Sequence, residues 1–457
     1  MDFVNLCHGL LASWHDKQGK TNETGKLLLW IQGENDKTHA ILRECKLSNS
    51  SYWFCDKDKS IVTNKNHSFF TLNGICGELN DGTAFQQPII LQNEVGYLGI
   101  IMKEMDGEIQ CLMQAKIEPG NVNNVQISPT IQATESNFTQ KHGGKKPNYL
   151  DYFSDVSRYQ VIYDGKESEQ CSRFLGKFNR NVAIFVDEEV EVLSNFRWMS
   201  IGQIKYLATH YPNLVNMDTR TVLSCLPYEL CHSVKDVGPA ETTLFAEDES
   251  DSLFAILTSF REIAKHHYDL IRLDQLDDWV IDDSGMRCRR EYPFEVRYFD
   301  IDIQGREVTH WNQPLVVARG EALFGLLAVN CGDAIRFLIR IKEEIGCADV
   351  ANFGPTIQME SNEIDKRSKD VIEILFFSRL NVKEDVLVDT ILSEEGGRFY
   401  HEENRNVLLM VSRGDLPANL PSGYYLASYR TLRQLIAKYH CANIQLRDLM
   451  SLYGGNL

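Results

Sequence analysis

The amino-acid sequence repeats itself once, at a nearly constant spacing. Motifs that match 226 positions apart are a Gln-Pro pair at 87–88 and 313–314, a Lys-x-Glu-x-Gly motif at 116–120 and 342–346, and a Pro-Thr-Ile-Gln run at 129–132 and 355–358. The spacing is 225 for an Asn-Arg-Asn run at 179–181 and 404–406, and 227 for the asparagines at 216 and 443. Such a spacing over almost two hundred residues predicts a tandem duplication, with one structural unit in each copy.

The chain has 457 residues, a length that suits two domains of about 200 residues each. Residues 236–251 combine a Gly-Pro pair with an acidic run, which is typical of a solvated linker. We therefore expect the first unit over residues 1–235 and the second over 252–457.

Each copy is expected to begin with a helix, to continue through several strands, and to close with two helices. The expected helices are 2–15, 201–210 and 218–226 in the first copy, and about 252–267, 428–439 and 446–453 in the second; expected strands include 69–72, 112–118, 298–303 and 400–405. Strands flanked by helices in each copy predict an α+β fold built from two modules of mixed β-sheet.

The composition excludes several classes of protein. The formal net charge of −17 argues against binding to nucleic acid or to an anionic membrane. The twelve cysteines form no C-x-x-C pair and no cluster with zinc-site spacing, which indicates reduced thiols. The N-terminal segment has neither the basic start nor the cleavage site of a signal peptide, and no apolar run has the length of a membrane span. We expect a cytoplasmic protein.

The strand expected over 112–118 has an unusual polar face. Gln114, Lys116 and Glu118 alternate with apolar residues, so their side chains share one side of the strand before it breaks at Pro119-Gly120. Lys116 and Glu118 recur in the second copy, whereas Gln114 and Asn121 are found only in the first, and Gln132 supplies a further amide nearby. An exposed charged strand face is the simpler interpretation. We instead predict a working pocket in the first copy.

A second candidate group lies over residues 393–406, where a Gly-Gly turn precedes Arg398, Tyr400, His401, Glu403 and Arg405. A histidine beside carboxylates suits general acid–base chemistry, although a charged surface turn is an equal alternative. The corresponding stretch of the first copy keeps the two arginines and the final asparagine, as Arg173, Arg180 and Asn181. It lacks the tyrosine, the histidine and both of the glutamates that follow the histidine.

Two loops before the closing helices of the first copy carry Arg197-Trp198 and Asn216 with Arg220. An arginine near a helix N-terminus suits phosphate binding, because free amides and the guanidinium face the anion together. Trp198 could stack on a base, although a buried anchoring tryptophan is more common. The sequence has no Walker A motif, Rossmann glycine fingerprint, H-E-x-x-H, G-x-S-x-G or Nudix box.

These motifs together resemble one family, the NDP-hexose 2,3-dehydratases of deoxysugar pathways, along nearly the whole chain. The resemblance is carried by Met113-Gln114-Ala115-Lys116-x-Glu118-Pro119-Gly120-Asn121, Ser128-Pro129-Thr130-x-Gln132-Ala133-Thr134, Ser136-Asn137-Phe138, Phe196-Arg197-Trp198, Val215-Asn216-Met217-Asp218-x-Arg220 and Ser393-Glu394-Glu395-Gly396-Gly397-Arg398-Phe399-Tyr400-His401. It implies two Nudix-like modules, a homodimer, and loss of the C2 hydroxyl from dTDP-4-keto-6-deoxyglucose. In the second copy the family pattern is broken at Arg340-Ile341 and Cys347, and no Arg-Trp pair follows.

That reaction needs a base at C3, a proton donor at the leaving oxygen and donors to the developing enolate, with neither a metal nor a hydride cofactor. The residues suggest Glu118 or Glu403 as the base, His401 or Tyr400 as the acid, and Lys116 on the enolate, with Arg180, Arg197 and Arg220 on the diphosphate. A 3-ketoreductase would consume the labile product. Alternatives are a 4-keto nucleotide-sugar isomerase or epimerase, a non-catalytic nucleotide-sugar binding protein and, disfavoured by the missing glutamate box, a diphosphate hydrolase.

Overall fold

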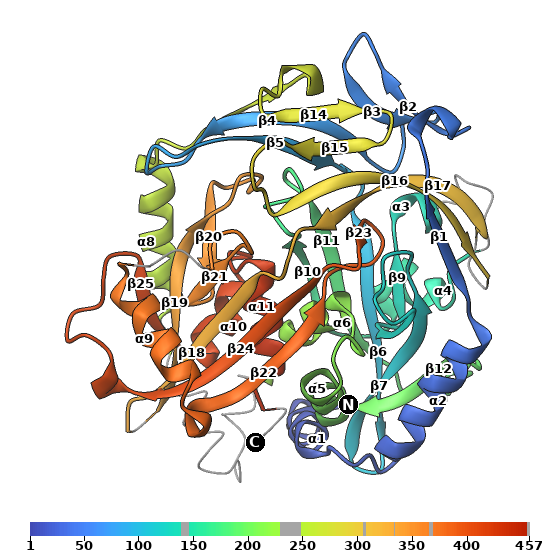
Figure 1. Ribbon diagram of the computed structural model, residues 1–457. Helices are drawn as coiled ribbons and strands as arrows, with labels where there is room; N and C mark the ends of the chain where they lie inside the picture. The colour runs from blue at the N-terminus through green and yellow to red at the C-terminus, as the bar shows by residue number, and fades with distance from the viewer. Residues whose placement is uncertain (139–145, 229–247, 305–307, 333, 365–368, 455–457) are drawn as a thin grey trace.

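The computed structural model describes residues 1–457 apart from 139–145, 229–247, 305–307, 333, 365–368 and 455–457. Its described residues form four β-sheets with helices packed around them, which confirms the expected α+β class (Figure 1). Two of the sheets each belong to one repeat, and the other two each combine strands of both repeats.

The two sheets that belong to single repeats have the same strand order. In the first repeat this order is β10 (Gln160–Ser168), β11 (Phe178–Phe185), β6 (Gly96–Met105), β7 (Glu108–Ile117) and β12 (Phe196–Ser200), with β8 (Val125–Ser128) beside β7 and β9 (Ile131–Ala133) beside β6. In the second repeat it is β22 (Val386–Ser393), β24 (Glu403–Ser412), β18 (Leu323–Asn330), β19 (Ile335–Glu343) and β25 (Tyr424–Ser428), with β20 (Ala351–Gly354) beside β19 and β21 (Ile357–Met359) beside β18. Each sheet contains one parallel pair, β11–β6 or β24–β18, and this shared order fits a tandem duplication.

The other two sheets exchange a strand between the repeats. One contains β2 (Trp53–Asp56), β3 (Ile61–Asn64), β4 (Thr71–Glu78), β5 (Ala84–Leu91) and, from the second repeat, β13 (His267–Ile271). The other contains β14 (Trp279–Asp282), β15 (Gly285–Cys288), β16 (Phe294–Ile303), β17 (His310–Ala318), β23 (Phe399–Tyr400) and, from the first repeat, β1 (Ala40–Glu44). Figure 1 shows the blue β1 beside the yellow strands of the second repeat.

All six expected helices are present near their predicted bounds. The helices are α1 (Phe3–His15), α2 (Thr24–Lys37), α3 (Glu135–Phe138), α4 (Leu150–Ser154), α5 (Ile201–His210), α6 (Met217–Ser224), α8 (Ser250–Ile263), α9 (Val371–Leu380), α10 (Tyr429–Ala437) and α11 (Ile444–Leu452). Ser200 caps α5 in a capping box with Gln203, as its sequence predicts. Asn216 caps α6, so this helix begins one residue before Asp218.

Three sequence predictions about local structure need correction. Phe69 has a φ of 70° and precedes β4, so the expected strand over 69–72 begins only at Thr71. His401 has a φ of 49°, which interrupts the strand expected over 400–405 between β23 and β24. Of the expected linker, residues 236–247 lie outside the described residues, and Asp251 already belongs to α8.

One apolar core spans both repeats. It contains Leu10 and Ile100 of the first repeat together with Leu326 and Leu449 of the second, all at most 1% exposed. Burial of this kind is the main source of stability in a globular domain. No helix in the described part of the chain has the length and apolar character required to cross a membrane.

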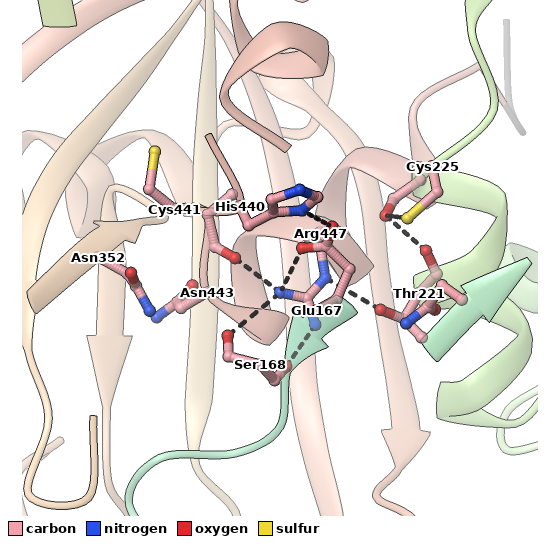
Figure 2. Close-up of polar contacts among 12 residues, drawn as sticks. Glu167, Ser168, Thr221, Cys225, Asn352, His440, Cys441, Asn443 and Arg447 are labelled. Carbon is pink, nitrogen blue, oxygen red and sulfur yellow. Dashed lines mark hydrogen bonds and ion pairs between the residues drawn. The ribbon is translucent and has the colours of Figure 1, made fainter. Parts of the chain in front are cut away.

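Two buried arginines, at corresponding positions of the two repeats, each form hydrogen bonds to the other repeat. Arg447 of α11 donates to the carbonyl of Ser168 at 2.5 Å and to the hydroxyl of Thr221 at 3.0 Å, both in the first repeat (Figure 2). Arg220 of α6 donates to the carbonyl of Ser393 at 3.1 Å and to Asp448 at 3.0 Å, both in the second. The two repeats therefore contact each other through an approximate twofold relationship.

Candidate functional site

A cavity of about 290 Å³ lies between the two repeats, and we refer to it as the inter-repeat cavity. Both repeats line it: Tyr52, Trp53, Phe69, Gly96, Leu98, Lys116, Glu118, Pro119, Gln132, Ala133, Thr134, Asn179 and Asp218 of the first, and Val308, Trp311, Asn312, Gln313, Glu395, Gly397 and Arg398 of the second. Its walls combine aromatic rings with carboxylates, which suits a ligand with both apolar and polar parts.

A second, more polar space of about 510 Å³ adjoins this cavity. It is lined in part by Gln114, Asn148, Asn195 and Gln304, and it shares Lys116 and Gln132 with the inter-repeat cavity. We refer to it as the polar chamber. Lys116 therefore lies between the two spaces and lines both of them.

Lys116 and Glu118 form a mostly buried ion pair at the end of β7. Their side chains lie on the same side of the strand, as their spacing predicts, with Nζ and Oε1 3.2 Å apart and exposed side-chain fractions of 11% and 9%. Lys116 also donates to the backbone carbonyl of Gln132 at 2.6 Å, which fixes the ammonium at the cavity wall. Strand β7 thus holds an ammonium group and a carboxylate group side by side at the cavity wall.

The turn after β7 packs directly against the Gly-Gly turn of the second repeat. The Gly120 amide donates to the Gly396 carbonyl at 2.7 Å, and the Gly120 carbonyl accepts from the His401 amide at 2.9 Å. Asn121 does not line the cavity; its side chain donates to the Asn124 carbonyl, and its Oδ1 lies against Gly396. These contacts bring Glu395 and Arg398 beside Glu118.

Arg398 lies at the centre of a group of buried acids. Its guanidinium is 3.1 Å from Glu395, which also accepts the amides of Gly397 at 2.7 Å and Arg398 at 3.1 Å, and it is 3.9 Å from Glu169. Burial raises the pKa of Glu395, Arg398 opposes this rise, and Glu118 adds to it. Burial lowers the pKa of Arg398, but the surrounding carboxylates outweigh that effect and raise it overall.

Asp218, in the first turn of α6, also faces this cavity and is only 2% exposed. Burial raises its pKa well above the ordinary value, the carboxylates of Glu169 and Glu395 raise it further, and Arg398 opposes the rise. An acid of this kind can hold a proton at neutral pH.

Aromatic residues line a further part of the cavity, and Trp53 and Trp311 come from the sheets that combine strands of both repeats. Trp311 on β17 donates through Nε1 to Gln313 at 2.8 Å, and Gln313 donates to the Gly397 carbonyl at 2.6 Å. Phe69, Tyr52 and the buried Trp53 lie in the first repeat. The second repeat thus completes the first repeat's cavity.

The structure does not bring the predicted acid–base group at 400–403 into the cavity. The His401 side chain is exposed and stacks on Tyr400 with ring centres 4.1 Å apart, because the left-handed backbone at His401 turns the chain away. Tyr400 also stacks on Phe299, and Glu403 accepts from Asn213. Partial shielding from water by its neighbours lowers the pKa of His401.

Several predicted binding residues have structural partners instead. Arg180 and Arg405 occupy equivalent positions, and each forms an ion pair across its hairpin, with Asp164 at 2.6 Å and Asp389 at 2.8 Å. Arg197 lies over the Trp30 ring at 5.1 Å and donates to the backbone.

The remaining predicted residues of the first repeat pack behind the cavity. Trp198 is buried in an apolar cluster, and Asn181 donates to the Asn179 carbonyl at 3.1 Å. Asn216 donates a hydrogen bond of 3.0 Å to the side-chain oxygen of Gln132 and so positions a residue that lines the cavity. Arg220 joins the repeats as described above. Of the predicted set, the cavity contains Lys116, Glu118, Gln132 and Arg398, and the polar chamber adds Gln114.

At the site related to this cavity by the duplication, which also combines residues of both repeats, the corresponding residues pair with one another. Arg173, the counterpart of Arg398, forms two bonds of 3.0 Å with Glu360 and covers the Phe294 ring at 4.4 Å. Glu344, the counterpart of Glu118, accepts from Gln358 and Asn443, both at 3.1 Å. The structure thus agrees with the prediction that the second copy has diverged, and Arg173 has a structural partner there.

Sequence reasoning missed Asp218, Glu395 and Trp311 as site residues. For the two acids a signal was present in the repeat itself, because the counterparts of Asp218 and Glu395 in the other copy are Gln445 and Gln170. No comparable signal exists for Trp311, because its place at the cavity depends on how the two repeats pack.

Comparison with known proteins gives a consistent result along the chain. A family model described as NDP-hexose 2,3-dehydratase matches twice, at residues 24–226 and 250–453. A relative from Saccharopolyspora spinosa, named dTDP-4-dehydro-6-deoxy-alpha-D-glucopyranose 2,3-dehydratase, is 37% identical over 415 residues, 88% of this chain and 85% of the relative.

Relatives with the same name occur in two further organisms. The protein from Streptomyces violaceoruber is 34% identical over 86% of this chain and 87% of its own length. The protein from Amycolatopsis orientalis is 30% identical over 95% of this chain and 90% of its own length. With both copies matched and an inter-repeat cavity that holds the family motif, the chain belongs to the NDP-hexose 2,3-dehydratase family and is a hydro-lyase.

Proposed function

We propose that this enzyme removes the C2 hydroxyl group of dTDP-4-keto-6-deoxyglucose, the sugar nucleotide also called dTDP-4-dehydro-6-deoxyglucose. The observation that carries the proposal is the Lys116–Glu118 pair, which lies at the wall of the inter-repeat cavity with its Nζ and Oε1 3.2 Å apart. The names of the relatives, which match over most of the chain, support the same substrate.

The reaction follows from the acidity of the C3 proton, which lies next to the C4 ketone. Removal of this proton gives an enolate, and the enolate expels the hydroxyl group at C2, which lies beta to the ketone. The enol that results tautomerises to a 3,4-diketo-2,6-dideoxy sugar, and the hydrogen from C3 and the hydroxyl from C2 leave as water. Elimination of this type requires a base, a donor to the enolate oxygen and a proton for the leaving group.

Glu118 is the proposed base and Lys116 the proposed donor to the enolate oxygen. Their ion pair keeps Glu118 in the charged form that accepts a proton. The same ammonium lies near the developing negative charge and stabilises the enolate more than the ketone, as a catalytic donor must. In this assignment Glu403, which lies outside the cavity, is not the base.

The proposal includes features of the assembly that the resemblance implies. Each repeat is a Nudix-like module, the enzyme acts as a cytoplasmic homodimer, and a 3-ketoreductase consumes the labile product. The paired sheet order of the two repeats supports the modular part of this proposal. Sedimentation of the purified enzyme at several concentrations tests the dimer.

The test of the function is turnover of the purified enzyme with dTDP-4-keto-6-deoxyglucose. With a 3-ketoreductase and its reduced cofactor present, we expect a dTDP-4-keto-2,6-dideoxyhexose, detected by mass spectrometry as loss of one oxygen from the substrate. Exchange of the C3 hydrogen with solvent in the wild-type enzyme, without any loss of oxygen, would indicate an isomerase or epimerase. Binding without exchange or turnover would indicate a binding protein.

A further inference from the structure

The proposed mechanism leaves one chemical requirement unassigned, the proton that the C2 hydroxyl needs in order to leave as water. The sequence suggested Tyr400 or His401, but neither side chain lines the inter-repeat cavity. Lys116 is already paired with Glu118, and an arginine such as Arg398 does not release its proton at physiological pH. The donor should therefore be sought among the buried acids of the cavity.

Three acids line this cavity, and their partners differ. Glu118 has the ammonium of Lys116 at 3.2 Å. Glu395 has the guanidinium of Arg398 at 3.1 Å and two backbone amides at 2.7 and 3.1 Å. Asp218 is 98% buried, and among the described residues its side chain has no hydrogen-bond partner.

These partners decide where a proton is held. Carboxylates that share a poorly hydrated site cannot all be ionised, and cations or amides favour the charged form of the group that they contact. Glu118 and Glu395 have such partners, whereas Asp218 faces Glu118, Glu395 and the nearby Glu169, against which the charge of Arg398 acts. The first-turn amides of α6 also favour a charged Asp218, but the crowding of acids and the burial outweigh them.

The site related to the cavity by the duplication provides an internal comparison. There the counterpart of Asp218 is Gln445 of the second repeat and the counterpart of Glu395 is Gln170 of the first, so two of the three cavity acids are present only at the working site. The third counterpart, Glu344, is held by two amide side chains. A packing role alone would not require an acid at position 218, because an uncharged amide, Gln445, occupies the corresponding position at the other site.

We propose that Asp218 is the general acid of the elimination, and that it donates its proton to the C2 oxygen as the C2–O bond breaks. This inference rests on the proposed function. The electron pair of the C3–H bond forms the enolate, the proton passes to Glu118, and the C2–O electron pair leaves with oxygen and takes the Asp218 proton to form water. Before the next turnover Glu118 releases its proton to solvent and Asp218 regains one from solvent.

The two proton transfers can be measured separately. In D₂O, removal and return of the C3 hydrogen incorporates deuterium, which NMR detects, while loss of the C2 oxygen is followed by mass spectrometry of the trapped product. For Asp218→Asn we expect loss of oxygen to slow by about a hundredfold or more, within the range for removal of a general acid. Deuterium incorporation at C3 should stay within about tenfold of the rate at which the wild type removes the C3 hydrogen.

Three further variants distinguish a role of Asp218 as the acid from a general loss of activity. Glu118→Gln should lose exchange and elimination together, and Asp274→Asn, at an exposed ion pair with Arg272, should retain both. Asp218→Glu keeps a protonatable group and should eliminate at least about tenfold faster than Asp218→Asn. It also keeps the test available if the asparagine variant does not fold.

The inference is overturned if Asp218→Asn eliminates at the wild-type rate. It is also overturned if the Asp218→Asn protein, folded and still binding dTDP, loses exchange and elimination by the same factor. A third contrary result is an Asp218→Glu protein that eliminates no faster than Asp218→Asn. These outcomes differ from failure of the proposed function, in which the wild-type enzyme does not release the C2 oxygen, whether or not it exchanges the C3 hydrogen.

Discussion

The amide of Gly120 donates a hydrogen bond of 2.7 Å to the carbonyl of Gly396, and these residues belong to different repeats. The second repeat has the equivalent contact, in which the Gly346 amide donates to the Cys171 carbonyl at 2.8 Å. Each turn thus lies against the loop of the other copy. At the first of these contacts, the backbone approach places Glu395 and Arg398 beside Glu118.

This close approach predicts that Gly120→Ala is strongly destabilising. A Cβ atom at position 120 would lie 1.5 Å from the carbonyl oxygen of Phe399, which is backbone and cannot rotate away. We expect a loss of about 3 kcal/mol in the free energy of unfolding, measured by urea denaturation. Gly33→Ala is the matched control, because its Cβ would meet nothing within 4 Å in helix α2 and should be neutral or stabilising. Equal stability of the two variants would contradict the contact.

Lys116→Met should reduce turnover sharply while leaving the fold intact. The ammonium is the proposed donor to the enolate, and loss of one such donor costs about a hundredfold to a thousandfold in kcat. The control is Lys342→Met, which makes the same change at the corresponding position of the second repeat. If both variants lose activity to the same extent, the two copies share the catalysis and the assignment to the first repeat is wrong.

Glu360→Gln should destabilise the enzyme without changing its chemistry. Arg173 is 3% exposed in its side chain and depends on Glu360 for two bonds of 3.0 Å, so the change leaves a buried guanidinium without its anion. We expect a loss of about 2–3 kcal/mol. Asp164→Asn, at the more exposed pair with Arg180, should cost less than about 1 kcal/mol. A large fall in kcat for the folded Glu360→Gln protein would contradict a structural role for this pair.

The pair of His440 and Glu167 should make stability depend on pH. Their Nδ1 and Oε1 atoms are 2.8 Å apart (Figure 2), and this hydrogen bond raises the pKa of His440 above 6.5 despite opposition from burial and Arg447. A raised pKa in the folded state stabilises the protein fully below the unfolded value of about 6.5, and this contribution is lost as pH rises through the higher folded value.

The measurement is the urea midpoint across that pH window for the wild type and for His440→Asn. Asparagine tolerates the left-handed backbone at this position, where φ is 48°, so the variant removes the titrating group with little strain. We expect a flatter dependence of stability on pH in the variant. Parallel curves for the two proteins would show that the pair does not contribute.

Much of the local structure could be predicted from the sequence, because short-range signals determine it. The capping box at Ser200 defines the start of α5, and the alternation over 113–118 places Lys116 and Glu118 on one side of β7. The repeat itself predicts that the two seven-stranded sheets share one order. These features depend on residues close together in sequence or on a direct match between copies.

The composition of the site was harder to predict, because it depends on contacts between the copies. His401 next to two glutamates suggested acid–base chemistry, but one left-handed residue turns its side chain out of the cavity. Trp311 enters the cavity only because the second repeat packs over the first. Arg220 was expected at a phosphate, yet the buried carbonyl of Ser393 and the carboxylate of Asp448 satisfy it.

The exchange of β1 and β13 has a consequence for the origin of this enzyme. A single copy of the repeat would lack the strand that its partner now supplies, and an uncovered sheet edge invites pairing with another chain. An ancestor with one repeat therefore had a structural reason to assemble as a strand-swapped pair of identical subunits. Fusion of two such copies would place that pair in one polypeptide, in which each repeat supplies a strand to a sheet of the other and the second repeat lines the cavity of the first.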